Sequence, residues 1–121
     1  MFWIDTPRTR AVAGHLPADG FARGGLEARL GSGPALLAVQ SLDAQPVEAS
    51  GDILISVVVP AAPATRKDLP FLSEPVTGVV RFHAPPGLMP AVSDGVTHRV
   101  EGDLHILEFD GAVAPVLLRL R

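Results

Sequence analysis

The sequence predicts an all-β fold, an antiparallel β-sandwich of about eight short strands that is immunoglobulin-like or jelly-roll-like. Two runs, residues 36–42 and 53–59, are dense in apolar and β-branched residues, the composition of strands on a buried pleated surface. The 12 glycines and 12 prolines are spread along the chain, and no stretch has the period of an amphipathic helix. Short strands joined by turns at this spacing are typical of a sandwich.

The N-terminal quarter is expected to contain two strands and a loop. Residues 2–4 form a short strand that ends before Pro7, which lacks a backbone donor. A second strand starts at 10–13. Residues 14–25 contain four glycines and a proline, so we expect a loop there, from which Phe21 returns to the core.

The next three segments are also expected to be strands. Residues 26–30 alternate with period two. The runs 36–42 and 53–59 are expected to be central strands, with turns at 43–46 and 50–52 where Asp, Pro, Ser and Gly gather. The residues expected on the inner face of the alternating segment are Leu26, Ala28 and Leu30.

The second half is expected to begin with a long loop and to end in a meander. Residues 60–75 carry four prolines, which exclude both a helix and a regular ladder. Such long loops are uncommon in compact domains and are usually functional or packed on a neighbour. Strand character resumes at 76–82. The last three strands are expected at 96–100, 104–109 and 116–120, with turns at 101–103 and 110–111.

Length and charge limit the classes of function. A chain of 121 residues has the size of one domain, so we expect a single β-sandwich over residues 1–121. The net charge is −3 and basic residues are scattered, which argues against a nucleic-acid partner. There is no cysteine for a disulfide or a thiolate metal site. The N-terminus lacks the features of a targeting signal, and the longest apolar run, 53–64, is too interrupted for a membrane span.

Two histidines raise the question of a metal site. A two-residue turn at 102–103 places His105 opposite Val100 and His98 opposite Leu107, so that the two imidazoles become diagonal neighbours on one face. A three-residue turn puts them on opposite faces. Since no third ligand is indicated, we expect no metal site. His15 and His83 lie beside Gly or Ala in loops and are expected to be solvated.

The sequence offers no catalytic constellation. Glycoside hydrolysis requires two carboxylates at a fixed separation, but the acidic residues stand mostly in turns, where they cap backbone groups. No serine sits in a Gly-x-Ser-x-Gly elbow, and no glycine-rich segment carries the residues of a phosphate loop. We therefore expect neither catalytic activity nor a cofactor. The acidic residues considered are Glu74, Asp94, Glu101, Asp103, Glu108 and Asp110.

The few aromatic residues are the candidates for ligand or interface contacts. Aromatic content is 5%, with one Trp and no Tyr, which a sandwich core largely consumes. A flat sugar-binding platform normally needs planar rings at the surface. Shallow binding through an aromatic side chain remains an alternative. The candidate residues are Phe2, Trp3, Phe21 and Phe71.

Three segments carry a resemblance to a known type of domain. They are Ile-Asp-Thr-Pro-Arg-Thr-Arg-Ala-Val-Ala-Gly at 4–14, Ser-Leu-Asp followed by Pro46, Ser50 and Ile-Leu-Ile at 41–55, and Glu-Pro-Val-Thr-Gly at 74–78. In this order they resemble the accessory β-sandwich that follows the catalytic barrel in many large bacterial glycoside hydrolases. The resemblance spans residues 2–121. The Ala/Pro-rich loop at 60–75 departs from it, and the barrel that carries the catalytic residues is absent.

The resemblance implies a non-catalytic module that packs against a glycoside hydrolase catalytic domain. It also implies an extracellular or periplasmic location if the parent enzyme is secreted; the sequence alone does not define the compartment. An exposed apolar patch around Phe2, Trp3 or Phe71 is expected for such a module. The alternatives are an autonomous carbohydrate-binding module, with a polysaccharide partner, and a structural domain that self-associates through an edge strand.

Overall fold

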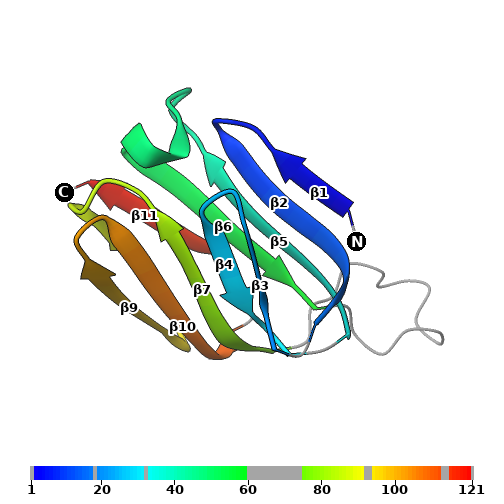
Figure 1. Ribbon diagram of the computed structural model, residues 1–121. Coiled ribbons are helices and arrows are strands. Elements are labelled where there is room, and N and C mark those ends of the chain that lie inside the picture. Colours follow the sequence, from blue (N-terminus) through cyan, green and yellow to red (C-terminus); the bar gives the residue numbers. More distant parts are fainter. Residues whose placement is uncertain are drawn as a thin grey trace, which may run out of the picture.

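The fold is a sandwich of two antiparallel β-sheets, as the sequence predicts (Figure 1). The computed structural model describes residues 2–17, 19–31, 33–59, 75–91, 94–112 and 115–120. Within them there are eleven strands rather than about eight, and one 3₁₀ turn, η1 (Val47–Ala49). Most of the predicted loop at 60–75 lies outside the described residues.

The first sheet has six strands in the order β1-β2-β5-β6-β11-β8. Its two central strands, β5 and β6, are those that the apolar runs predict, and they pair directly with each other through the register Val39 to Ile55. The strands are β1 (Phe2–Asp5), β2 (Thr9–Leu16), β5 (Gly33–Ser41), β6 (Asp52–Val58), β11 (Val116–Leu120) and β8 (Leu88–Pro90).

The second sheet has five strands in the order β3-β4-β7-β10-β9 and covers one face of the first (Figure 1). The prediction of alternation in the segment around β4 is confirmed, because Leu26 and Ala28 are buried and Leu30 packs on the core. The strands are β3 (Phe21–Arg23), β4 (Leu26–Arg29), β7 (Val76–His83), β10 (Leu104–Ala112) and β9 (Val96–Glu101).

Three predictions about elements are wrong. Residues 14–25 are not one loop: β2 continues to Leu16, and Gly24 and Gly25, both at positive φ, make the tight turn from β3 into β4. Strand β8 was missed because it contains Pro90, which an edge strand tolerates. The final meander is also wrong, since β11 leaves β10 and pairs with β6 and β8 in the other sheet.

Two glycine positions explain why β10 runs as it does. Gly102, at φ 64°, forms the two-residue turn between β9 and β10, so the predicted hairpin is confirmed. The predicted turn at 110–111 is instead a bulge: Gly111, at φ 78°, interrupts the register between Asp110 and Ala112 while the strand continues. The bulge comes just before the chain crosses to the other sheet.

The core lies between the two sheets and is mostly aliphatic, with Phe82 and Phe109 as its buried aromatic residues. Buried side chains come from the inward-facing positions of both sheets, with Leu37 and Ile53 from the first sheet and Val80 and Leu107 from the second fully enclosed. At roughly 1.5–3 kcal/mol for each fully buried aliphatic side chain, this burial is the main stabilising contribution. The side chains on the outward faces of the two sheets are not part of this core.

Candidate interaction face

The outward-facing side chains of the six-stranded sheet are mostly apolar. Val12, Leu37 and Ile55 are buried and point into the core. Because side chains alternate along a strand, the residues that flank each of them in sequence point away from the core. We call the outward set the outer apolar face. It consists of Phe2 and Ile4 on β1, Ala11 and Ala13 on β2, Leu36 and Ala38 on β5, Leu54 and Val58 on β6, Leu117 on β11 and Met89 on β8.

These side chains form continuous rows across the sheet. One row runs Phe2, Ala13, Leu36 and Val58 through directly paired positions on β1, β2, β5 and β6. Phe2 is 67% exposed and Leu36 39%, and Ile4 and Met89 on the same face are 41% and 46% exposed. Large apolar side chains that share one exposed face mark an interaction site more often than scattered ones do.

Polar groups interrupt the outer apolar face only sparsely. Its centre contains the uncharged Thr9, Gln40 and Ser56. Charged residues appear near the β8 edge, where Arg119 Nε donates to Asp52 Oδ1 at 3.1 Å. Arg119 is paired with Asp52 on β6 and with Met89 on β8. The outer apolar face is thus a hydrophobic patch with few polar side chains and with its ion pair near one edge; the core of a protein interface is likewise poor in charged residues.

The outward face of the five-stranded sheet has the opposite character. A row of directly paired positions on β4, β7, β10 and β9 reads Glu27, Arg81, Ile106 and Arg99. The exposed Arg29 and Glu108 belong to the adjacent row. Charged residues of both signs are typical of a surface that remains in water. The contrast shows that the apolar side chains of the other sheet are not a general property of this surface.

The sequence of the central strands reflects this difference. Antiparallel strands with one face in water normally alternate apolar and polar residues, whereas strands covered on both faces read as continuous apolar runs. β9 alternates, with outward Thr97, Arg99 and Glu101. β5 and β6 do not alternate: they read Ala-Leu-Leu-Ala-Val and Ile-Leu-Ile-Ser-Val-Val. Their composition is that of strands covered twice, but only one of their faces is covered by the other sheet.

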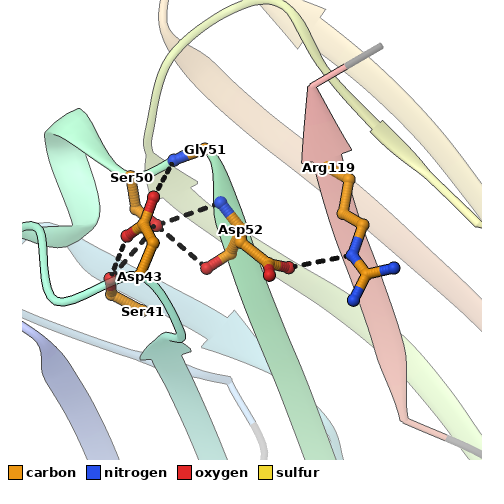
Figure 2. A network of polar contacts seen from close by, with 6 residues as sticks. All are labelled: Ser41, Asp43, Ser50, Gly51, Asp52 and Arg119. Atoms are coloured by element: carbon orange, nitrogen blue, oxygen red, sulfur yellow. Dashed lines mark hydrogen bonds and ion pairs between the residues drawn. The ribbon is translucent and has the colours of Figure 1, made fainter.

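A carboxylate fixes the connection between these two strands (Figure 2). Asp43 accepts hydrogen bonds from the backbone N–H of Gly51 at 2.8 Å and from the hydroxyls of Ser50 at 2.8 Å and Ser41 at 2.9 Å. The bond from Gly51, followed by that from Ser50, lowers the pKa of Asp43 from 3.8 to about 2. These contacts are local and hold the turn, so we assign Asp43 a structural role.

The sequence-predicted aromatic candidates are not brought together on one surface. Phe2 lies on the outer apolar face, whereas Trp3 points inward. The Trp3 ring meets Phe21 edge to face at 5.3 Å, and the guanidinium of Arg23 lies 4.9 Å from its centroid. These side chains close the sandwich between the edge strands β1 and β3. Phe71 lies outside the described residues.

The two histidines of the β9–β10 hairpin are neighbours, as the two-residue turn predicts. His98 Nε2 lies 2.8 Å from His105 Nδ1, and His105 Nε2 lies 2.8 Å from the carbonyl oxygen of Pro85. Because a carbonyl only accepts, His105 donates from Nε2, and its Nδ1 accepts from His98. Burial, together with the nearby His105, lowers the pKa of His98. The groups of His, Asp and Glu in the described residues include no cluster of three that would hold a metal.

A second group of charged residues lies at one end of the sandwich. Arg10 Nη1 pairs with Glu48 at 2.7 Å, and Arg10 Nε lies 3.4 Å from Asp5. Burial is the largest single effect on Glu48 and raises its pKa, but the hydrogen bond and charge of Arg10, together with the Glu48 backbone N–H and the charge of His83, lower the pKa by more. The adjoining cavity has a volume of about 10 Å³, space for a single water molecule. The group therefore offers no room for a substrate.

His83 was expected to be solvated, and it is exposed at the end of β7, where its Nδ1 lies 2.9 Å from Asp103 Oδ1. This bond is the main cause of the lowered pKa of Asp103. His15, expected in a loop, is exposed on β2 instead. Most of the remaining acidic candidates, Asp94, Glu101, Glu108 and Asp110, are exposed, whereas Glu74 lies outside the described residues.

Comparison with known proteins adds no relative. No family model, no curated protein and no solved structure matches this chain. In the part of the chain that the structure describes, no helix has the length and hydropathy to cross a membrane.

Proposed function

We propose that this chain is a non-catalytic β-sandwich module that works by docking its outer apolar face onto another protein domain. The observation that carries the proposal is the two-sided apolar composition of β5 and β6, in a sheet that the described strands cover on one side only. A protein surface that supplies the second layer would bury Phe2, Ile4, Leu36 and Met89, which are exposed in the isolated chain.

The proposed partner is the catalytic domain of a glycoside hydrolase. The source of this assignment is the resemblance of residues 4–14, 41–55 and 74–78 to accessory sandwiches of such enzymes. Two of these segments contribute to the outer apolar face. The 4–14 segment supplies Ile4 on β1 and Ala11 on β2. The 41–55 segment contains Asp43, which fixes the β5–β6 connection. The partner domain would carry the catalytic residues.

The geometry gives less support to an autonomous carbohydrate-binding module. Trp3 is engaged by both Phe21 and Arg23, and the exposed ring of Phe2 lies in a row of aliphatic side chains, without the polar groups that orient a sugar. Self-association would use the same outer apolar face or the edge of β1. It differs from docking on another protein in its product, because the complex would then contain only copies of this chain.

Photo-cross-linking in the source cells tests the proposal. A photoreactive amino acid replaces Leu36, which is exposed on the outer apolar face in the central strand β5. The matched control replaces Thr97, an exposed residue on the outward face of β9. We expect a specific product from position 36 whose peptides, identified by mass spectrometry, come from a glycoside hydrolase catalytic domain, in a partner or in the same polypeptide. Products containing only this chain, or equal products from both positions, would contradict the proposal.

A further inference from the structure

We propose that a groove on the five-stranded sheet binds small organic anions, with Arg29 and Arg81 holding the carboxylate or phosphate group. The groove has a volume of about 480 Å³, within the range of small-molecule sites. It is formed by β3, β4 and β7, on the side of the sandwich opposite to the outer apolar face. Both faces therefore remain available at the same time.

The two arginines are placed on one face of neighbouring strands. Glu27 is directly paired with Arg81, and Arg29 is directly paired with Val79, so Arg29 and Arg81 occupy diagonal positions. At this separation both long side chains reach a single group bound between them. Guanidinium groups bind carboxylates and phosphates through paired N–H donors.

Neither arginine has its hydrogen-bonding capacity filled. Arg29 is exposed, and its guanidinium makes no hydrogen bond or ion pair within the described part of the chain. Arg81 lies 3.8 Å from Glu27, too far for a direct hydrogen bond, and its Nε is shielded from water without any partner. An unsatisfied N–H of this kind carries a free-energy penalty. An anion that draws it outward removes this penalty.

The rest of the lining defines the class of ligand. The groove is also lined by Val79 and Ala22, which share the outward face with the arginines, and by Phe21 and Ala28; this lining suits an apolar or planar body. Asp19 and Glu27 balance the arginine charges, so the groove has no large net charge that would attract every anion. A ligand that combines an apolar body with one oxyanion fits both features.

Binding is tested by two-dimensional NMR titration of the whole chain with benzoate and phenyl phosphate, with benzyl alcohol as the uncharged analogue. We expect saturable shifts of the amide resonances of β3, β4 and β7 with one or both anions and none with the alcohol. The tighter anion distinguishes a carboxylate from a phosphate ligand. Similar shifts with benzyl alcohol, or no saturable shift with either anion, would overturn the proposal.

Substitutions locate the site. Arg29→Gln is expected to weaken binding by roughly tenfold or more, as is Arg81→Gln, because each removes a charge-assisted bond. Arg81→Lys, which keeps the charge but loses the paired donors, shows whether an effect at 81 comes from the fork geometry. The control is Arg99→Gln, since Arg99 is exposed on the same face but does not line the groove. Equal weakening by Arg29→Gln and Arg99→Gln would mean general charge attraction and would refute the site.

Discussion

A single carboxylate fixes the turn between the two central strands. Asp43 accepts bonds from groups up to eight residues away in sequence. Among them is the Ser50 hydroxyl, which accepts from the Asp52 N–H and whose single proton lies between Asp43 Oδ1 and the Asp52 carbonyl oxygen. The carboxylate thus organises the segment through which the chain leaves β5 and enters β6 (Figure 2). It acts only when ionised, since a protonated carboxyl accepts fewer bonds.

The first prediction concerns acid stability. The folded pKa of Asp43, about 2, is below its ordinary value of 3.8. Its contribution to the free energy of unfolding is therefore complete above about pH 4 and is lost as the pH falls toward 2. Asp43→Asn is expected to lower the melting temperature at pH 7, as measured by circular dichroism. The melting temperature of this variant is also expected to change less between pH 4 and pH 2 than that of the native chain. Asp94→Asn, at an exposed turn, serves as the control; identical behaviour of the two variants would exclude the role of Asp43.

The second prediction concerns His98. Its pKa in the folded chain is below the ordinary value of 6.5, so the unfolded chain takes up the proton first as the pH falls. Stability is expected to be complete above about pH 6.5 and to decline below it. Urea unfolding between pH 5 and 7.5 is expected to show a smaller slope for His98→Gln than for the native chain. His15→Gln, on an exposed position of β2, is expected to keep the native slope; a native profile without any slope in this range would contradict the assignment.

At the scale of the strand, neighbouring residues of β5 have opposite roles. Leu37 is fully buried and Leu36 is 39% exposed on the outer apolar face. Leu37→Ala is expected to cost about 2–5 kcal/mol of unfolding free energy. Leu36→Ala is expected to cost about 1 kcal/mol or less, because it removes little buried area in the isolated chain. Chemical denaturation of the two variants makes the comparison, and equal costs would mean that the outer apolar face is already covered.

A glycine in the middle of β7 tests how closely the strands approach. Gly78 has a φ of 149°, and a Cβ there would overlap the carbonyl oxygen of Arg29 at the end of β4. Gly78→Ala is expected to cost more than about 3 kcal/mol, the sum of backbone strain and displacement of β4. The control Gly102→Ala also has a positive φ, 64°, but open space around it, and is expected to cost about 1 kcal/mol. Thermal unfolding compares them, and similar melting temperatures would contradict the close approach.

The sequence predicts those elements whose residues act locally. The apolar runs identified β5 and β6 as central strands. The sequence left two turn lengths open between β9 and β10, and the structure has the two-residue turn, which places His98 beside His105. Pairings between segments far apart in sequence could not be predicted from local patterns. The turn residues before β11 are those of a meander, but β11 pairs with the apolar strand β6 of the other sheet. Strands of three residues, β3 and β8, are too short to show a period.

The candidate interaction face was only partly predictable. Phe2 belongs to it, but Trp3 does not, because alternation along β1 turns neighbouring residues to opposite faces. Most members of the outer apolar face are Ala, Leu and Val, which sequence reasoning assigns to the core. The available signal was the lack of alternation in β5 and β6, which indicates two covered faces. The groove depends on the pairing of β4 with β7, which the local sequence does not define.

At the scale of the whole molecule, the two sheets differ in their outward faces. One core is shared between them, while the outward faces differ: one is apolar and continuous, the other charged and hollowed by a groove. A module of this kind can attach to a protein through one face and expose the other to solutes. The proposed docking and the proposed anion binding therefore make independent claims, which different variants test.

The most direct test of the central claim measures whether the outer apolar face is covered in the source cells. The chain has no cysteine, so Leu36→Cys and Thr97→Cys each introduce a unique thiol. Maleimide labelling is followed for both variants, in the purified dilute chain and in the cells. We predict that Leu36→Cys reacts readily when purified but at least about tenfold more slowly in the cells, while Thr97→Cys reacts alike in both, after correction for reagent entry. Equal labelling of the two positions in the cells would contradict a docked outer apolar face.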